Sequence, residues 1–201
     1  MSENESPNYN LIALDPNLLS TPFKIQTNWH VITGAPSSGK TTMINLIKDH
    51  GLKTVPEFAR LYIEMEMAKG LSVQEVQKDL LALQRDIVDF HIKIVEKLPT
   101  NEVLFLDRGF PDCLSYHRLR GLDPNELLIY CFDHHYKSVF ILDRLPFQQD
   151  GVRYEDNEMA EFHQSWLHKD YRALGHHPIR VPIISPEERL RFILKKLSEQ
   201  E

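Results

Sequence analysis

The stretch WHVITGAPSSGKTTMINLI, residues 29–47, decides the fold. It begins with a short apolar run, continues as G-x-x-x-x-G-K-T from Gly34, and ends in apolar residues at helical spacing. Strand, glycine-rich loop and helix in this order are typical of a P-loop, whose backbone N–H groups point at phosphate oxygens. The positive end of the helix dipole favours the same anion. The stretch therefore predicts binding of a nucleoside triphosphate.

The residues of this loop have different expected tasks. Lys40 places a positive charge on the β- and γ-phosphates, and the Thr41 hydroxyl can ligate Mg²⁺. The motif does not separate ATP from GTP, so either nucleotide stays open. The predicted nucleotide-binding residues are Gly34, Ala35, Pro36, Ser37, Ser38, Gly39, Lys40, Thr41 and Thr42.

Length and composition are those of an ordinary globular domain. The chain has 201 residues, of which 42% are hydrophobic and 26% charged. Its net charge of −6 disfavours nucleic acid and anionic membranes as partners. The two cysteines, Cys113 and Cys131, are expected to be reduced thiols. The sequence shows no apparent signal peptide or membrane-spanning run. Together these features predict a cytoplasmic protein. The ten histidines accompany no zinc-binding motif, so no zinc is predicted.

The chain divides into two parts of different character. Residues 1–27 are polar and contain three prolines, which predicts a flexible or strapped-on extension. Residues 28–201 alternate short strand-like runs with helix-like runs, which predicts one α/β domain with a parallel five-stranded sheet covered by helices on both faces. The expected strands are residues 29–33, 53–56, 103–107, 138–143 and 179–183.

Three helices carry clear start signals. Ser72 with Glu75 forms a capping-box pattern, and apolar residues at helical spacing behind it predict a helix over 72–98. Its apolar stripe fits core packing, and a homodimer interface is the alternative. Asp123 before Pro124 indicates another helix, and Ser185-Pro186 precedes a last helix over 189–196.

Acidic and basic residues follow two of the expected strands. Asp107 ends an apolar strand, as does the acid that holds Mg²⁺ in P-loop enzymes. Arg108 comes next, at the sheet edge where ligands bind, although an ion pair with a neighbouring acid would also explain it. Glu57 follows the second strand and could accept a proton from a substrate hydroxyl, or could simply favour the helix dipole. Arg60, one turn later, could bind the substrate.

Further candidates lie beyond these strand ends. The polar connection after the fourth strand contains Arg144 and Arg153, and it fits a lid closing over transferred phosphate, with a solvated loop as the alternative. Asp156 is expected to cap the next helix. Aromatic rings that could stack on a substrate, or equally belong to the core, are those of Phe110, Tyr116 and His117.

Five segments together resemble a known group: GAPSSGKTT, VPEFAR, FLDRGFPDCLSYHRLRGL, LPFQQDGVRYED and RVPIISPEERLRFIL. They resemble the NadR-like AAA-domain family of small P-loop proteins over residues 29–197. The resemblance implies the three-layer architecture of small-molecule P-loop kinases, with strand order 2-3-1-4-5 and a helical lid. It also implies that Ile184, Ser185 and Pro186 border the adenine.

Nicotinamide-riboside kinase domains and, more distantly, deoxynucleoside kinases look similar. In the latter, an acid after the second strand acts as base and a D/E-R-S segment follows the third strand. Glu57 and Asp107-Arg108 stand at those places, while Gly109 replaces the serine. Because of this departure, the resemblance does not support a deoxynucleoside assignment.

The first functional hypothesis is a Mg²⁺-dependent kinase that phosphorylates a hydroxyl of a small, nucleoside-like acceptor. A nucleotide-dependent switch or slow NTPase signalling to a protein partner is the alternative. Phosphorylation of nucleic-acid ends is a third option, which the acidic composition disfavours. Thr41 and Asp107 are the predicted metal ligands. The predicted catalytic residues are Lys40, Glu57, Asp107, Arg108 and Arg153.

Overall fold

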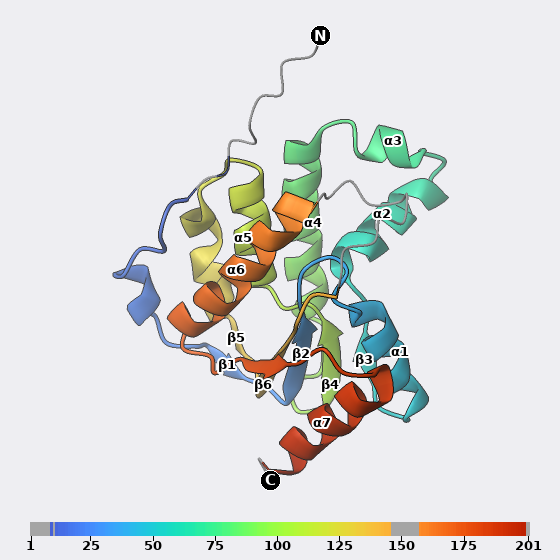
Figure 1. Ribbon diagram of the computed structural model, residues 1–201. Coiled ribbons are helices and arrows are strands. Elements are labelled where there is room, and N and C mark those ends of the chain that lie inside the picture. Colours follow the sequence, from blue (N-terminus) through green and yellow to red (C-terminus); the bar gives the residue numbers. More distant parts are fainter. Residues whose placement is uncertain (1–8, 10, 146–156, 200–201) are drawn as a thin grey trace.

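The structure, a computed structural model, describes residue 9 and residues 11–145 and 157–199 (Figure 1). Its main sheet has five parallel strands in the order β3-β4-β2-β6-β7. Counted along the chain, these five strands have the order 2-3-1-4-5, which confirms the predicted three-layer P-loop architecture. The strands are β2 (Trp29–Thr33), β3 (Thr54–Val55), β4 (Leu104–Asp107), β6 (Ser138–Leu142) and β7 (Ile179–Val181).

The observed strands are shorter than predicted at several ends. β3 stops at Val55 and β7 at Val181, each directly before a proline. A proline has no N–H to donate to the next ladder position, so Pro56 and Pro182 end the pairing. Val103 and Asp143, predicted as strand residues, lie outside β4 and β6.

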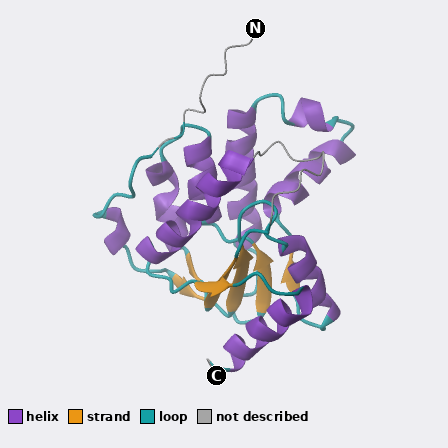
Figure 2. Ribbon diagram, viewed as in Figure 1, coloured by secondary structure: helices purple, strands orange, loops and turns teal. Residues whose placement is uncertain are grey.

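Helices cover both faces of the main sheet (Figure 2). Neighbouring residues of a strand point to opposite faces of the sheet. Ile32 therefore packs with α1 (Lys40–Asp49) and α7 (Pro186–Ser198) on one face. Val31 packs with the layer of helices on the opposite face. That layer includes α2 (Phe58–Ala68), α4 (Leu80–Val95), α5 (Asp112–Leu119) and α6 (Asn157–Ala173). Trp29, Phe105 and Phe140 are fully buried in the resulting core.

The single helix predicted over 72–98 is wrong. The capping box at Ser72 and Glu75 exists, but it begins only the short α3 (Val73–Val76). The Asp79 carboxylate then accepts hydrogen bonds from the N–H groups of Leu81 and Ala82, at 3.0 Å each, and begins α4. A second N-cap inside the apolar pattern therefore breaks the helix.

Two other helices also differ from prediction. Asp123 caps an element as expected, but the element is the 3₁₀ helix η2 (Pro124–Phe132). The last helix begins at Pro186 and ends at Ser198, which is longer than predicted, with a capping box between Ser185 and Glu188. The predicted cap at Asp156 lies outside the described residues. Among the described residues, no helix is long and apolar enough to cross a membrane.

The described part of the N-terminal segment packs against the domain. Its 3₁₀ turn η1 (Leu18–Ser20) precedes β1 (Ile25–Gln26), which pairs in parallel with β5 (His134–His135) in a separate small sheet. Leu14 is buried, and Arg118 Nε of α5 donates to Ile12 O at 3.3 Å. Residues 11–27 thus run over α5 and η2, while the division of the chain at residue 27 stays a prediction.

Candidate functional site

The loop between β2 and α1 has the backbone shape that its glycines predict. Ser37 and Gly39 are left-handed, with φ values of 63° and 85°. A Cβ atom at Gly34 would lie 2.7 Å from Ser38 Oγ and 2.8 Å from Leu142 O. The tight packing at Gly34 and the turn at Gly39 therefore both require glycine.

Lys40 lies folded against its own loop. Its Nζ donates to Gly34 O at 2.7 Å and to Ala35 O at 3.1 Å. Burial, followed by the nearby positive charge of Arg108, lowers the pKa of Lys40 to about 8. The ammonium group of Lys40 therefore loses its proton at a lower pH than that of an ordinary lysine.

Glu57 and Arg108 form an ion pair at the carboxyl edge of the sheet. Arg108 Nε donates to Glu57 Oε1 at 2.8 Å, and Arg108 Nη1 lies 3.3 Å from Gly34 O of the P-loop. Burial alone would raise the pKa of Glu57, but Arg108 and then Lys40 outweigh it and hold this pKa below its usual value. The carboxylate is therefore ionised at neutral pH, beside the end of the P-loop where a γ-phosphate is expected.

Of the two structural alternatives, the ion pair is present at Arg108, while capping by Glu57 is not found among the described residues. Glu57 is the N-cap residue of α2, but no capping hydrogen bond of its side chain is found among the described residues. Arg108 does form ion pairs, with both Glu57 and Asp112. Its left-handed backbone (φ 75°) is strained for a non-glycine residue by about 1 kcal/mol, which is common at functional sites.

Asp107 ends β4 with a carboxylate that is only 7% exposed. Its Oδ1 has no hydrogen-bond partner among the described residues. Burial, followed by the negative charge of Glu57, raises its pKa to about 6. A buried carboxylate oxygen without a partner is costly, and a bound cation would remove this cost.

A magnesium ion fits this donor set. Thr41 lies exposed in the first turn of α1, and the Asp107 and Thr41 oxygens are the hard ligands that Mg²⁺ prefers. The described residues contain no group of three or more His, Cys, Asp or Glu side chains that could hold a metal by themselves. Mg²⁺ sites in such enzymes are completed by phosphate and water oxygens, so this arrangement suits a nucleotide-bound metal.

Asp112 is a central residue of the site that the sequence interpretation missed. This buried carboxylate accepts from Arg108 Nη1 at 3.1 Å, from the Tyr171 hydroxyl at 2.7 Å, and from the Thr33 hydroxyl. It therefore holds Arg108 at a different guanidinium nitrogen from the one that Glu57 binds. The available signal was its spacing, four residues after Arg108 at the start of a helix.

His163 of α6 supports Arg108 as well. Its Nε2 lies 3.1 Å from Arg108 Nη1, and because a guanidinium only donates, this nitrogen accepts. The proton is thereby assigned to Nδ1, which faces the Ser115 hydroxyl. Burial, followed by Arg108, holds the pKa of His163 well below its usual value, so the ring is neutral. No sequence motif pointed to this residue.

The adjacent Gln164 holds the P-loop. Its Oε1 accepts from Ala35 N at 2.9 Å, and its Nε2 donates to Leu142 O at 3.4 Å. These contacts join α6 to the first half of the loop and to the end of β6. The sequence offered no signal for them.

The remaining predicted residues separate into site and core. Tyr116 is half-buried, and its ring centroid lies 5.3 Å from Arg108 Cζ, so it borders the ion pair. Phe110 and His117 are buried, against His91 and Gln84 respectively, which favours the core over the stacking interpretation for both. Arg60 is exposed on α2.

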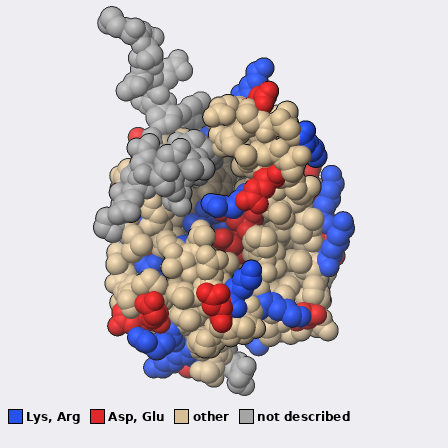
Figure 3. Space-filling model, turned by 90° about the vertical axis from the view of Figure 1, so that its right-hand side faces the viewer, with Lys and Arg blue, Asp and Glu red and all other residues tan. Residues whose placement is uncertain are grey.

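Two parts of the predicted site stay predictions. Arg153 lies outside the described residues. Ser185 and Pro186 are exposed at the start of α7, where the Ser185 hydroxyl is used for capping, and Ile184 beside them is 37% exposed. The face that carries α1 and α2 has a hollow in which acidic and basic side chains lie next to one another (Figure 3).

Fold and motif together define a protein with the P-loop kinase architecture. An AAA-domain family model matches residues 29–189, so the chain belongs to this AAA-domain family. The predicted resemblance to NadR-like P-loop proteins is confirmed by this match together with the similar fold of NadR. No curated protein matches the chain significantly.

Three solved structures illustrate the similarity of fold. Thymidylate kinase from Ehrlichia chaffeensis has a TM-score of 0.62 at 15% identity, covering 86% of this chain and 98% of that one. Deoxyadenosine kinase from M. mycoides has a TM-score of 0.59 at 13% identity, covering 85% and 99%. NadR in complex with NR has a TM-score of 0.61 at 18% identity, covering 87% of this chain but 51% of that one. The chain thus spans about half the length of NadR.

Proposed function

We propose that the protein is a Mg²⁺-dependent kinase that transfers the γ-phosphoryl group of ATP to a hydroxyl of a small, nucleoside-like molecule. The observation that carries this proposal is the ionised Glu57 carboxylate, paired with Arg108 beside Gly34 O of the P-loop. A base and a cation at the phosphate end of a P-loop suit phosphoryl transfer. The folds of thymidylate kinase, deoxyadenosine kinase and NadR with bound NR support the same class of reaction.

The charges of the site favour a hydroxyl over a phosphate as the acceptor group. An acceptor phosphate would bring negative charge against ionised Glu57, with Asp107 and Asp112 close by. The two cations of the site, Arg108 and Lys40, already face these carboxylates and the bound triphosphate, so little positive charge would remain for a second phosphate. A neutral hydroxyl can instead donate a hydrogen bond to Glu57. The acceptor is therefore an alcohol such as the hydroxymethyl group of a riboside.

In the proposed reaction, the acceptor oxygen attacks the γ-phosphorus while Glu57 takes the hydroxyl proton. The bond from the γ-phosphorus to the β–γ bridging oxygen breaks, and ADP leaves with its electron pair. Lys40 and Arg108 stabilise the charge that spreads over the phosphoryl oxygens. Mg²⁺, held by Asp107 and Thr41, would neutralise charge on the β- and γ-phosphates when bound.

Other parts of the proposal concern the surroundings of this centre. Arg153 is proposed to reach the transferred group from the connection after β6, and Ile184, Ser185 and Pro186 are proposed to contact the adenine. Cys113 and Cys131 are both free and buried, which fits a cytoplasmic location. A homodimer stays a prediction.

The test is transfer of label from γ-labelled ATP to a panel of nucleosides, ribosides, sugars and nucleoside monophosphates. Label on a neutral riboside or nucleoside supports the proposal, and a Lys40→Met variant serves as the inactive control. Label on monophosphates alone would contradict the hydroxyl acceptor. Label released only as inorganic phosphate would contradict the kinase and favour a nucleotide-dependent switch.

A further inference from the structure

One buried arginine of α7 joins three separate segments around the P-loop. Arg189 is 3% exposed, and its guanidinium donates to Ser38 O at 2.6 Å, Asp143 O at 3.0 Å and Pro182 O at 2.9 Å. The three acceptors belong to the P-loop, to the segment after β6 and to the segment after β7. All three are backbone carbonyls, so one side chain joins all three loops at once.

Burying a guanidinium against neutral carbonyls is an expensive way to stabilise a fold. Desolvation of a charged group costs several kcal/mol, and well-packed apolar residues often replace buried charges without loss of stability. A guanidinium differs from them in its rigid set of donors, which can bind several acceptors at once in fixed directions. The geometry therefore suits positioning of the loops better than stability alone.

The contact with Ser38 O fixes the direction of a P-loop amide. In a planar trans peptide, the C=O and the following N–H point in opposite directions. Because Arg189 holds the Ser38 carbonyl, the Gly39 N–H points away from Arg189. Gly39 is the left-handed glycine before Lys40, where P-loop amides are aimed at phosphate. A charged donor also polarises the peptide, which strengthens its N–H as a donor.

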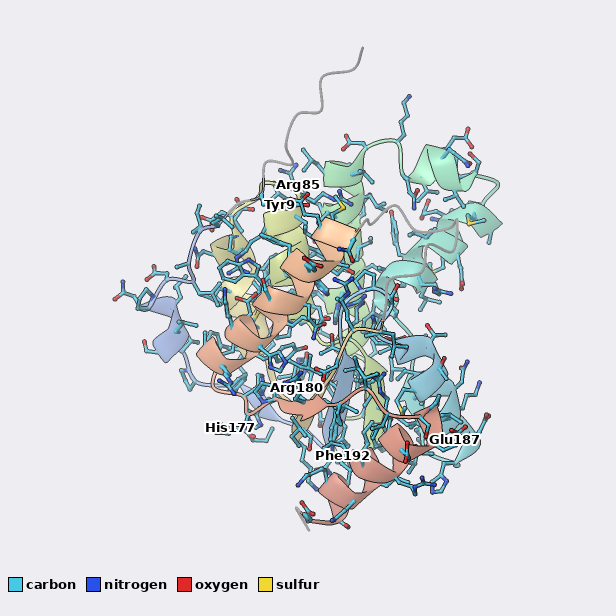
Figure 4. All side chains as sticks on the ribbon, in the orientation of Figure 1. Tyr9, Arg85, His177, Arg180, Glu187 and Phe192 are labelled. Carbon is cyan, nitrogen blue, oxygen red and sulfur yellow. The ribbon has the colours of Figure 1, made fainter. Side chains whose placement is uncertain are left out.

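The other two contacts extend this unit. Leu145, two residues after Asp143, donates its N–H to Ser37 O at 3.0 Å, so a second bond joins the same segment to the P-loop. Pro182 lies two residues before Ile184, the first of the residues proposed to contact the adenine. Figure 4 labels Arg180 of β7 and Glu187 and Phe192 of α7, which lie on either side of Arg189 in the sequence.

From this arrangement we propose that Arg189 is a positioning residue for the nucleotide, which sets the P-loop amides and holds the phosphate and base loops together. This inference rests on the proposed binding of ATP. It assigns Arg189 no contact with the acceptor, so its loss should act on the nucleotide and not on the acceptor.

Arg180 offers a matched control. It is also an arginine at this end of the sheet, and its Nε donates to Asp143 Oδ1 at 2.6 Å. Its side chain is 73% exposed, however, and its partner is a carboxylate and not a loop carbonyl. Substituting it removes a cation near Asp143 without touching the P-loop.

The experiment compares Arg189→Met, Arg189→Lys and Arg180→Met with the wild type. MgATP affinity is measured by calorimetry without acceptor, and kcat and both KM values are measured in the transfer assay. Arg189→Met should raise the Kd and KM for ATP about tenfold, the loss typical of a hydrogen bond from a charged group. The acceptor KM should change less than twofold, Arg189→Lys should recover part of the loss, and Arg180→Met should match the wild type.

A merely structural role would give a different pattern. If Arg189 only stabilised the fold, its substitution would lower the fraction of active protein and therefore the apparent kcat, with both KM values unchanged. That result would overturn the inference. So would a folded Arg189→Met or Arg189→Lys variant with wild-type ATP affinity. A wild type that binds ATP but phosphorylates no acceptor would contradict the kinase proposal, and the calorimetric comparison would still decide the role of Arg189.

Discussion

Arg108 Nε lies 2.8 Å from Glu57 Oε1, although 51 positions separate the two residues in the chain. Each residue follows the carboxyl end of its strand, and β3 and β4 are neighbours in the sheet. Parallel strands bring such ends to the same edge, where ligands of α/β sheets bind. The pair therefore places an ionised carboxylate and a cation beside Gly34, at the start of the P-loop.

Removal of the proposed base should separate chemistry from nucleotide binding. Glu57→Gln keeps the size of the side chain but removes its ability to take a proton. We expect kcat to fall about 10²- to 10⁴-fold, the usual contribution of a general base, with ATP affinity nearly unchanged. Glu64→Gln, exposed on the same helix, is the control. Unchanged turnover of Glu57→Gln in steady-state assays would exclude the proposed role.

Loss of Arg108 should change the pH dependence of the reaction. Arg108 opposes the effect of burial on Glu57, so in Arg108→Met the pKa of Glu57 should rise. The acidic limb of the pH profile of kcat/KM should then move to higher pH, and part of the activity lost at pH 7 should return at higher pH. A profile of unchanged shape and lower height would show that Arg108 does not set this pKa.

Without bound Mg²⁺ and nucleotide, the ionised Asp107 carboxylate should lower the free energy of unfolding of the protein. Its pKa rises from 3.8 to about 6, so between these values the folded state binds more protons than the unfolded state. Stability due to this group is therefore present at low pH and lost as pH rises through about 6. Asp107→Asn should raise the free energy of unfolding at pH 7 by about 1–3 kcal/mol and weaken Mg²⁺-dependent ATP binding.

Urea denaturation at pH 5 and pH 7 measures the first effect, and calorimetry with and without Mg²⁺ measures the second. The stability difference between Asp107→Asn and the wild type should shrink at pH 5, where the wild-type carboxyl is protonated. A difference that is independent of pH, or Mg²⁺-dependent binding that survives the substitution, would contradict the assignment.

Gly109 stands where deoxynucleoside kinases have a serine, and the structure gives a steric reason. A Cβ at this position would lie 2.5 Å from the Tyr171 hydroxyl and 3.1 Å from Tyr136 Cε2. Gly109→Ser should therefore reduce the free energy of unfolding by about 1–3 kcal/mol, as overpacking does. Tyr171→Phe removes the clashing oxygen. The variant with both substitutions should therefore lose less free energy of unfolding than the sum of the losses in the two single variants.

A double-mutant cycle measured by denaturant unfolding checks this coupling. A parallel cycle with Tyr62→Phe is the control, because Tyr62 lies on α2 and bonds to Asp86 at 3.2 Å. That control cycle should be additive. Additivity in the Tyr171 cycle would mean that the hydroxyl is not the obstacle.

Local sequence patterns predicted the parts of the site that lie at element ends. The P-loop is contiguous, so its glycines, Lys40 and Thr41 could be recognised directly. Asp107 and Glu57 could be placed at one edge because they follow strands of a parallel sheet. The helix over 72–98 was predicted wrongly because an apolar period does not reveal that Asp79 caps a new helix within it.

The sequence by itself determined the fold, the loop that binds phosphate and the acids beside it, since each has a local pattern. Only the tertiary structure decided what holds them in place. His163 fixes Arg108, Gln164 holds Ala35, and Arg189 reaches Ser38 across 151 positions. Such contacts join segments far apart in the chain, and neither periodicity nor spacing encodes them. They exist because folding packs α6 and α7 against the loop.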